Sequence, residues 1–219
     1  MGKKGIKKKK RKQERMKTIT ILLTGYSDWF GRFIRVISRS GYSHASLSID
    51  GTEEVFYSFN GKGVVVEEPK KRKSRRRKEG SVCIRIRVPE SICHDIAEEI
   101  QRFLEQKDIY TYSRLGVILC LLHIPHKFEN SYFCSQFVAE VLSKSGAVQL
   151  KKKESLYLPN HLIDGFECLF SQKQIAYNVI LPYYRPFIWR AIFDLENGVE
   201  RKNQQFIREY FLKRLLSED

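Results

Sequence analysis

Short segments in which apolar and polar side chains alternate dominate the first ninety residues of the chain. This period of two is typical of β-strands with one buried face. An Asp-Gly pair at residues 50–51 follows one such segment and favours a tight return into the next. The strands are expected at 18–24, 44–50, 55–59, 64–68 and 82–88, with one amphipathic helix at 28–39. The pattern therefore requires a sheet whose consecutive strands are mostly antiparallel.

After residue 90 the apolar residues recur at helical spacing instead. Pro89 begins the first of these segments, and Gly146 ends the most apolar one. Helices are expected at about 90–106, at 114–123, from Asn130 or Ser131 to about Ser145, and near 159–164; two short strands are expected within 167–181, and 186–216 is mostly helical. Strands with one early helix, then helices, then strands, predict an α+β fold.

The formal net charge of +15 comes from two runs of basic residues. Residues 1–17 hold ten Lys or Arg and one acid, residues 69–78 hold eight and none, and the remainder holds 22 basic against 24 acidic residues. The body of the protein is therefore not basic, which argues against the whole fold being a nucleic-acid-binding surface. We expect residues 1–17 to be a disordered tail. Residues 18–219 are then a single domain, with 69–78 as a solvated loop insertion and a C-terminal helical extension from about 186.

Each run can attract a polyanion, although either can also be no more than a solvated segment. Near an anionic membrane each basic residue contributes roughly 1 kcal/mol. Neither run contains an aromatic residue, so stacking on nucleic-acid bases is unsupported, and attraction to RNA would act on the phosphates. Charge alone does not separate an anionic membrane surface from RNA as the partner.

The cysteines and the hydropathy of the chain indicate a compartment. Five widely spaced cysteines, an odd number, favour reduced thiols: Cys83, Cys93, Cys120, Cys134 and Cys168. No apolar stretch approaches the ~18 residues that a transmembrane helix needs. We expect a cytoplasmic protein, peripheral at a membrane if the basic runs bind one. No cofactor is implied, and Cys120, His123 and His126 lack the spacing of a metal site.

Two residues stand out as candidates for chemistry. His44 opens an alternating strand on its polar face, and Cys134 lies in the first turn of a helix. A thiol there gains from the helix dipole and from backbone N–H groups without helical partners. If the helix packs on the sheet, the imidazole can take the thiol proton. The alternative is structural: Cys134 is in register with Phe137 and Val141, as a small buried side chain would be.

Two motifs carry a resemblance to a known family. Gly41-Tyr-Ser-His-Ala-Ser-Leu-Ser-Ile-Asp50, followed by Tyr132-Phe-Cys-Ser-Gln-Phe-Val-Ala-Glu-Val-Leu142, resembles the circularly permuted NlpC-type papain-like cysteine hydrolases, most closely their YiiX-like branch. The resemblance covers roughly residues 18–170. It implies a permuted papain-like fold and acyl hydrolysis or transfer at an amide or ester bond through a thioester. Cys134 would be the nucleophile and His44 the general base. The substrate stays open among peptide, cell-wall fragment, lipid and modified protein.

The residue that would orient the histidine is where the chain departs from the family. Relatives often carry Glu on the strand after the histidine strand. By position Ser58 is the first choice here and Asn60 the second, while Glu54 and Glu67 are other carboxylates in the region. A serine cannot stabilise an imidazolium as a carboxylate does. The alternative function is therefore a catalytically silent ligand-binding module whose basic segments attract a polyanion.

Overall fold

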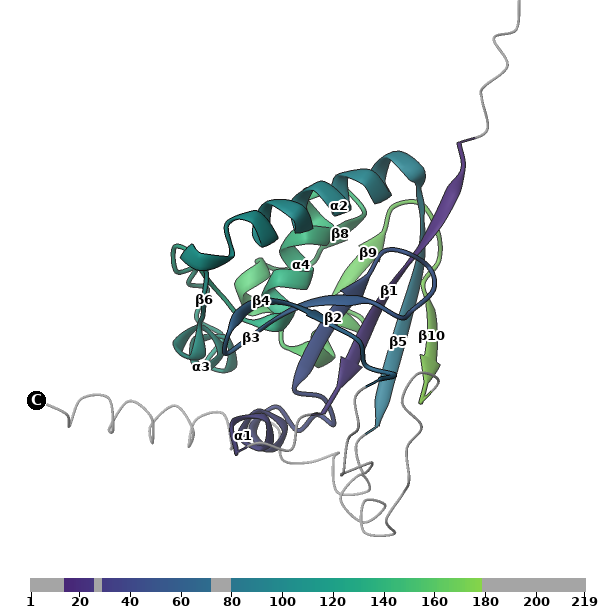
Figure 1. Ribbon diagram of the computed structural model, residues 1–219. Helices are drawn as coiled ribbons and strands as arrows, with labels where there is room; N and C mark the ends of the chain where they lie inside the picture. The colour runs from purple at the N-terminus through teal and green to yellow at the C-terminus, as the bar shows by residue number, and fades with distance from the viewer. Residues whose placement is uncertain (1–13, 26–28, 72–79, 179–219) are drawn as a thin grey trace, which may run out of the picture.

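A six-stranded antiparallel sheet forms the centre of the molecule, in the order β10-β5-β1-β2-β3-β4 (Figure 1). A computed structural model describes residues 14–25, 29–71 and 80–178, and the statements below concern these residues. The strands are β1 (Met16–Thr24), β2 (His44–Ser48), β3 (Phe56–Asn60), β4 (Gly63–Glu67), β5 (Ser81–Pro89) and β10 (Gln174–Tyr177). The predicted α+β class is confirmed.

Four α-helices belong to the described part of the chain. They are α1 (Trp29–Ile37), α2 (Glu90–Glu105), α3 (Arg114–Leu121) and α4 (Cys134–Lys144), with 3-10 turns η1 (Lys107–Ile109), η2 (Glu154–Leu156) and η3 (Pro159–Leu162). Two small sheets complete the fold: β6 (Thr111–Tyr112) is parallel to β7 (Ser131–Tyr132), and β8 (Val148–Leu150) is antiparallel to β9 (Phe166–Cys168). None of these helices is both long and apolar enough to cross a membrane.

The main core lies between the sheet and the helices α2 and α4. The alternating apolar residues of β1, β2 and β5 point toward these helices and are fully or almost fully buried. At 1.5–3 kcal/mol for each large aliphatic side chain, roughly, this face accounts for much of the stability of the fold. Phe59 of β3 lies at one end of the core, with its ring centroid 5.7 Å from that of Phe137 on α4. That contact helps hold α4 against the sheet.

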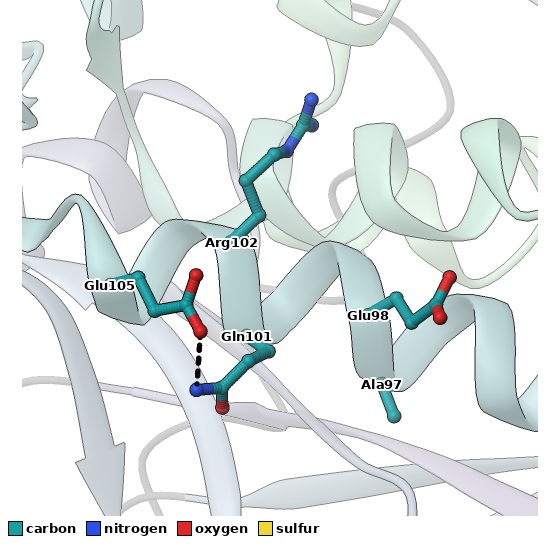
Figure 2. Close-up of a pocket in the computed structure, with 5 residues that line it drawn as sticks. All are labelled: Ala97, Glu98, Gln101, Arg102 and Glu105. Atoms are coloured by element: carbon teal, nitrogen blue, oxygen red, sulfur yellow. Dashed lines mark hydrogen bonds between the residues drawn. The ribbon is translucent and has the colours of Figure 1, made fainter.

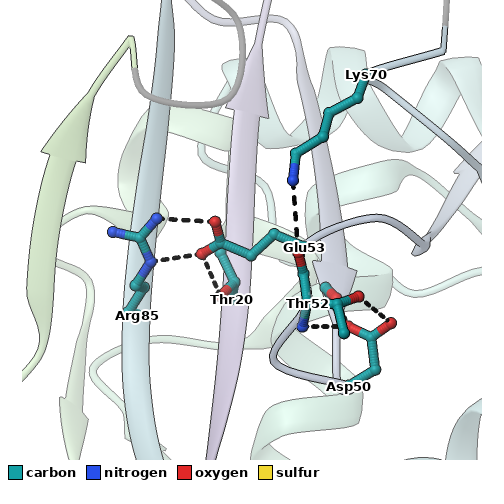
Figure 3. A network of polar contacts seen from close by, with 7 residues as sticks. Thr20, Asp50, Thr52, Glu53, Lys70 and Arg85 are labelled. Atoms are coloured by element: carbon teal, nitrogen blue, oxygen red, sulfur yellow. Dashed lines mark hydrogen bonds and ion pairs between the residues drawn. The ribbon is translucent and has the colours of Figure 1, made fainter.

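The opposite face of the sheet is also buried, and it combines polar residues with a small apolar cluster of Leu22, Phe56 and Cys83. His44, Ser46 and Ser48 lie there, as the alternation predicts, yet every residue of β2 is buried. The loop between β2 and β3 lies over this face, because Glu53 accepts hydrogen bonds from Thr20 of β1 (3.0 Å) and from Arg85 of β5 (Figure 3). The Arg85 contact uses Nε and Nη2, the second at 2.8 Å. Both faces of the central strands are therefore enclosed.

Two predicted boundaries need correction. β1 begins at Met16, so the last residues of the predicted tail 1–17 belong to the sheet. The charge of Lys17 is balanced by Glu90, 3.3 Å away, which a reading of local charge could not anticipate. Likewise α4 begins only at Cys134, because Ser131 and Tyr132 pair with β6 instead of capping the helix.

The basic run 69–78 lies between β4 and β5, as predicted. Its residues 72–78, most of the predicted tail and the predicted helical segment 186–216 lie outside the described residues.

Candidate functional site

The first residue of β2 and the first residue of α4 meet at one end of the sheet. His44 opens β2, and Cys134 follows the N-cap residue Phe133 of α4. Helix α4 packs against β2 and β3, which fixes its N-terminus beside the histidine. The thiol Sγ lies 3.9 Å from the carbonyl oxygen of Ser43, the residue before His44. The two predicted site residues are thus brought together by elements 90 residues apart in sequence.

The His44 ring has a polar partner on each side. Its Nε2 lies 3.0 Å from Oε2 of Glu67, the last residue of β4. The ring is also hydrogen-bonded to the side chain of Cys134. Nε2 is the ring nitrogen that faces Glu67. The three side chains therefore form a carboxylate–imidazole–thiol chain.

These surroundings change the acidity of the imidazole. Complete burial on its own would lower the pKa of His44, because a charged ring loses its hydration. The hydrogen bonds to Cys134 and Glu67 and the negative charge of Glu67 outweigh burial and raise the pKa of His44 to about 9. The protonated ring is therefore the favoured form at neutral pH.

The side chain next to Nε2 of His44 is Glu67, whereas Ser58 makes a different contact. The Ser58 hydroxyl is buried and donates to the carbonyl of Ala45 at 2.6 Å. Asn60 accepts from the backbone of Lys62 at 2.9 Å. In the sheet register Ser58 pairs with Ser46, two residues beyond His44.

The reason for this difference is the path of the β3–β4 hairpin, which crosses β2 at a steep angle (Figure 1). Because sheets twist from strand to strand, the residue that reaches His44 is not the one that strand order suggests. The signal for Glu67 in the sequence is chemical: it is a carboxylate that ends an otherwise apolar strand.

The N-terminus of α4 adds hydrogen-bond donors to the site. The backbone N–H of Phe137 is the first to bond within the helix, to the carbonyl of Phe133. The amides of Cys134, Ser135 and Gln136 precede it and have no acceptor inside the helix. Together with the positive end of the helix dipole, amides in this position can stabilise an oxyanion formed next to Sγ.

The site is closed in this conformation. Cys134 and His44 are each only 3% exposed, and the Glu67 side chain is 15% exposed. A shallow hollow elsewhere is lined by Ala97, Glu98, Gln101, Arg102 and Glu105, all on one side of α2 (Figure 2). None of these residues belongs to the Cys134–His44 pair. Gln101 donates to Glu105 at 3.0 Å, Arg102 pairs with Glu99, and Glu98 lies 3.5 Å from His94.

The remaining thiols and imidazoles form no second site of this kind within the described residues. Burial raises the pKa of Cys120 to about 12, which makes it a poor nucleophile. Burial likewise lowers the pKa of His161 to about 4, and its Nδ1 accepts from Lys152 at 2.7 Å. His94, Asp95 and Glu98 on α2 place potential metal ligands within 4.8 Å of one another, but all three are exposed, and exposed groups like these commonly hold no ion.

Comparison with known proteins leaves the site to be interpreted from its own geometry. No model of a known protein family matches the chain, and no curated protein matches it in sequence.

Proposed function

We propose that this protein is a cysteine hydrolase with a permuted papain-like fold, which cleaves or transfers an acyl group at an amide or ester bond. The observation that carries the proposal is the Glu67–His44–Cys134 chain, with Nε2 of His44 3.0 Å from the carboxylate. Each member has the chemistry that its place requires: a thiol at a helix N-terminus, a buried imidazole with a raised pKa, and a carboxylate behind it.

The reaction follows from these positions. The protonated His44 ring holds the proton of the Cys–His pair, and Cys134 attacks the substrate carbonyl carbon as the thiolate. The α4 amides stabilise the resulting oxyanion. The tetrahedral intermediate collapses to a thioester, and His44 protonates the departing amine or alcohol. A water molecule, deprotonated by His44, then hydrolyses the thioester and regenerates the thiol. Glu67 keeps the ring in the correct tautomer and stabilises the imidazolium.

The arrangement of elements also supports the proposal. The histidine strand precedes the cysteine helix, and this helix packs on an antiparallel sheet, as the resemblance to the permuted family implies. The alternative of a catalytically silent binding module rested on the lack of a carboxylate next to the histidine. Glu67 removes that reason. Because both reacting groups are buried, a neighbouring segment must move before a substrate carbonyl can reach Sγ.

Labelling with a small thiol-directed acyl probe tests this function. We expect the full-length protein to be labelled at Cys134, and we expect Cys134→Ala to lose the label while its circular dichroism spectrum is unchanged. The matched control is Cys168→Ala, which removes a more exposed thiol outside the site and should label normally. Equal labelling of wild type and Cys134→Ala would refute the proposal.

A further inference from the structure

The outward face of α1 combines exposed apolar side chains with arginines. Trp29 is 70% exposed and Val36 is 76% exposed, the two highest values among the large apolar residues of the described chain. Arg32 lies between them on the same face, because residues three or four apart are neighbours on a helix. Arg39, just beyond the helix, is also exposed. We call Trp29, Arg32, Val36 and Arg39 the α1 outer face.

The opposite side of the same helix is firmly packed. Ile34 is buried in a cluster with Phe133 and Val117, and Phe30 and Phe33 pack against it. Helix α1 thus has an inner apolar side that the fold uses and an outer apolar side that the described fold leaves exposed. An exposed tryptophan flanked by arginines is unfavourable in water alone, and it suits a surface that is apolar inside and negatively charged outside.

The charge around α1 points the same way. No Asp or Glu occurs between Asp28, which precedes the helix, and Asp50, while Arg32, Arg35 and Arg39 all lie in this segment. The first turn of the helix contains no acid either. Arginine side chains can extend along an apolar surface and keep the guanidinium at the phosphate level. The arginines of the α1 outer face therefore complement anionic lipid headgroups, and its apolar side chains complement the acyl chains.

We propose that α1 docks on an anionic phospholipid bilayer, inserting Trp29 and Val36 while Arg32 and Arg39 contact lipid phosphates. Among polyanions the bilayer is favoured over RNA, because RNA offers no acyl region for an aliphatic side chain such as Val36. Docking does not depend on the proposed hydrolysis. It would nevertheless place the site near the bilayer, since α1 joins the end of β1 to His44 and packs on Phe133, the neighbour of Cys134.

Tryptophan fluorescence tests the docking directly. The chain has two tryptophans, so Trp189→Phe leaves Trp29 as the only reporter. We expect its emission to shift to the blue with vesicles of equal parts phosphatidylcholine and phosphatidylserine, and much less with phosphatidylcholine alone. In the same background, Arg32→Gln with Arg39→Gln should weaken partitioning at least roughly tenfold. Val36→Asp should abolish the shift even where the basic runs still hold the protein on the vesicles.

Matched controls are Leu169→Asp and Arg87→Gln, exposed residues of the same kinds away from α1. Both should bind like the parent, and circular dichroism should show all variants folded. Three results would overturn the proposal: Trp29 emission that does not change in vesicle-bound protein, emission already blue-shifted in buffer because another part of the chain covers the face, or a shift produced by RNA and not by vesicles. Equal loss of binding in the controls would do the same.

Discussion

The candidate site depends on how one histidine uses its two ring nitrogens. A histidine at the start of a strand is ordinarily solvated or hydrogen-bonded to the backbone. His44 is buried, with Glu67 at Nε2 and Cys134 as its second partner. Burial makes both contacts stronger, because water does not screen them. In an exposed position these contacts would be screened by water, and the pKa of the histidine would stay near its ordinary value.

Replacing the carboxylate should therefore change how activity depends on pH. In Glu67→Gln we expect kcat/KM to fall by about 10²-fold or more, since the imidazolium loses its counter-charge. The raised pKa of His44, about 9, predicts that wild-type activity declines as pH rises through about 9 and the ring loses its proton. In the variant this decline should move toward the ordinary histidine pKa of roughly 6.5. A pH profile of acyl-probe labelling measures it.

Ser58→Ala is the control for this prediction, because sequence position favoured Ser58 for the same role. The Ser58 hydroxyl donates to the carbonyl of Ala45 and not to the His44 ring, so the pH profile should stay unchanged. The free energy of unfolding should fall by about 1 kcal/mol as that buried acceptor loses its donor. A profile that moves in Ser58→Ala and not in Glu67→Gln would reverse the assignment.

At the scale of elements, the loop between β2 and β3 is what encloses the polar face of the sheet. Asp50 orders the start of the loop by accepting from Ser48 and from the backbone of Thr52. Glu53 then fastens the loop to β1 and β5 through Thr20 and Arg85 (Figure 3). This arrangement lets a strand with alternating small polar residues be buried on both sides.

Breaking this contact should lower stability in a pH-dependent way. The hydrogen bond from Arg85 is the main cause of the lowered pKa of Glu53. The contact therefore contributes fully above the ordinary carboxyl pKa and is lost as pH falls through the lowered folded value. In Glu53→Gln we expect the free energy of unfolding at neutral pH to fall by roughly 1–2 kcal/mol, and the acid-induced loss to become shallower. Urea titrations between neutral and acidic pH measure both effects.

The matched control is Glu98→Gln on the exposed side of α2, a carboxylate that pairs with the exposed His94. Exposed pairs of this kind contribute little, so its unfolding curve should overlay that of the wild type at neutral pH. If Glu53→Gln also overlaid the wild type, Glu53 would have no part in closing the sheet.

At the scale of the whole molecule, the basic runs and the candidate site lie in different parts of the chain. The basic run 69–78 begins directly after β4, whose last residue is Glu67, yet its first lysines do not contact the site. Lys70 donates to the backbone of Thr52, and Lys71 pairs with Glu68. The site itself is built from strand and helix ends inside a body without excess positive charge.

Neutralising the basic run should therefore weaken polyanion binding without changing the reactivity of Cys134. With the six basic residues within 72–78 changed to Gln, we expect weaker and less salt-sensitive retention on a polyanion such as heparin, because fewer counterions are released on binding. Acyl-probe labelling of Cys134 in solution should be unchanged. A control with Lys107, Lys151 and Lys153 changed to Gln should retain more of the salt dependence. Loss of labelling in a folded variant would show that the run serves the site.

Much of the fold could be predicted from local pattern, and so could two members of the site. Alternation located β2 and put His44 on its polar side, while helical spacing placed Cys134 in the first turn of α4. These are short-range properties, since the period of apolar residues reports the conformation of the segment that carries them. The early start of β1 was missed because Lys17 is balanced by Glu90, more than 70 residues away.

The sequence by itself determined the order of the α-helices and of the strands of the main sheet, the two residues of the candidate Cys–His pair and the separation of the basic runs from the body. The short strands β6, β7 and β8 were not predicted. Only the tertiary structure decided that Glu67, and not Ser58, contacts Nε2 of His44. It also decided that both sides of β2 are buried. The physical reason is that strand pairing fixes only which residues lie opposite each other on adjacent strands. The steep crossing of the β3–β4 hairpin and the path of the β2–β3 loop decide which distant side chains meet.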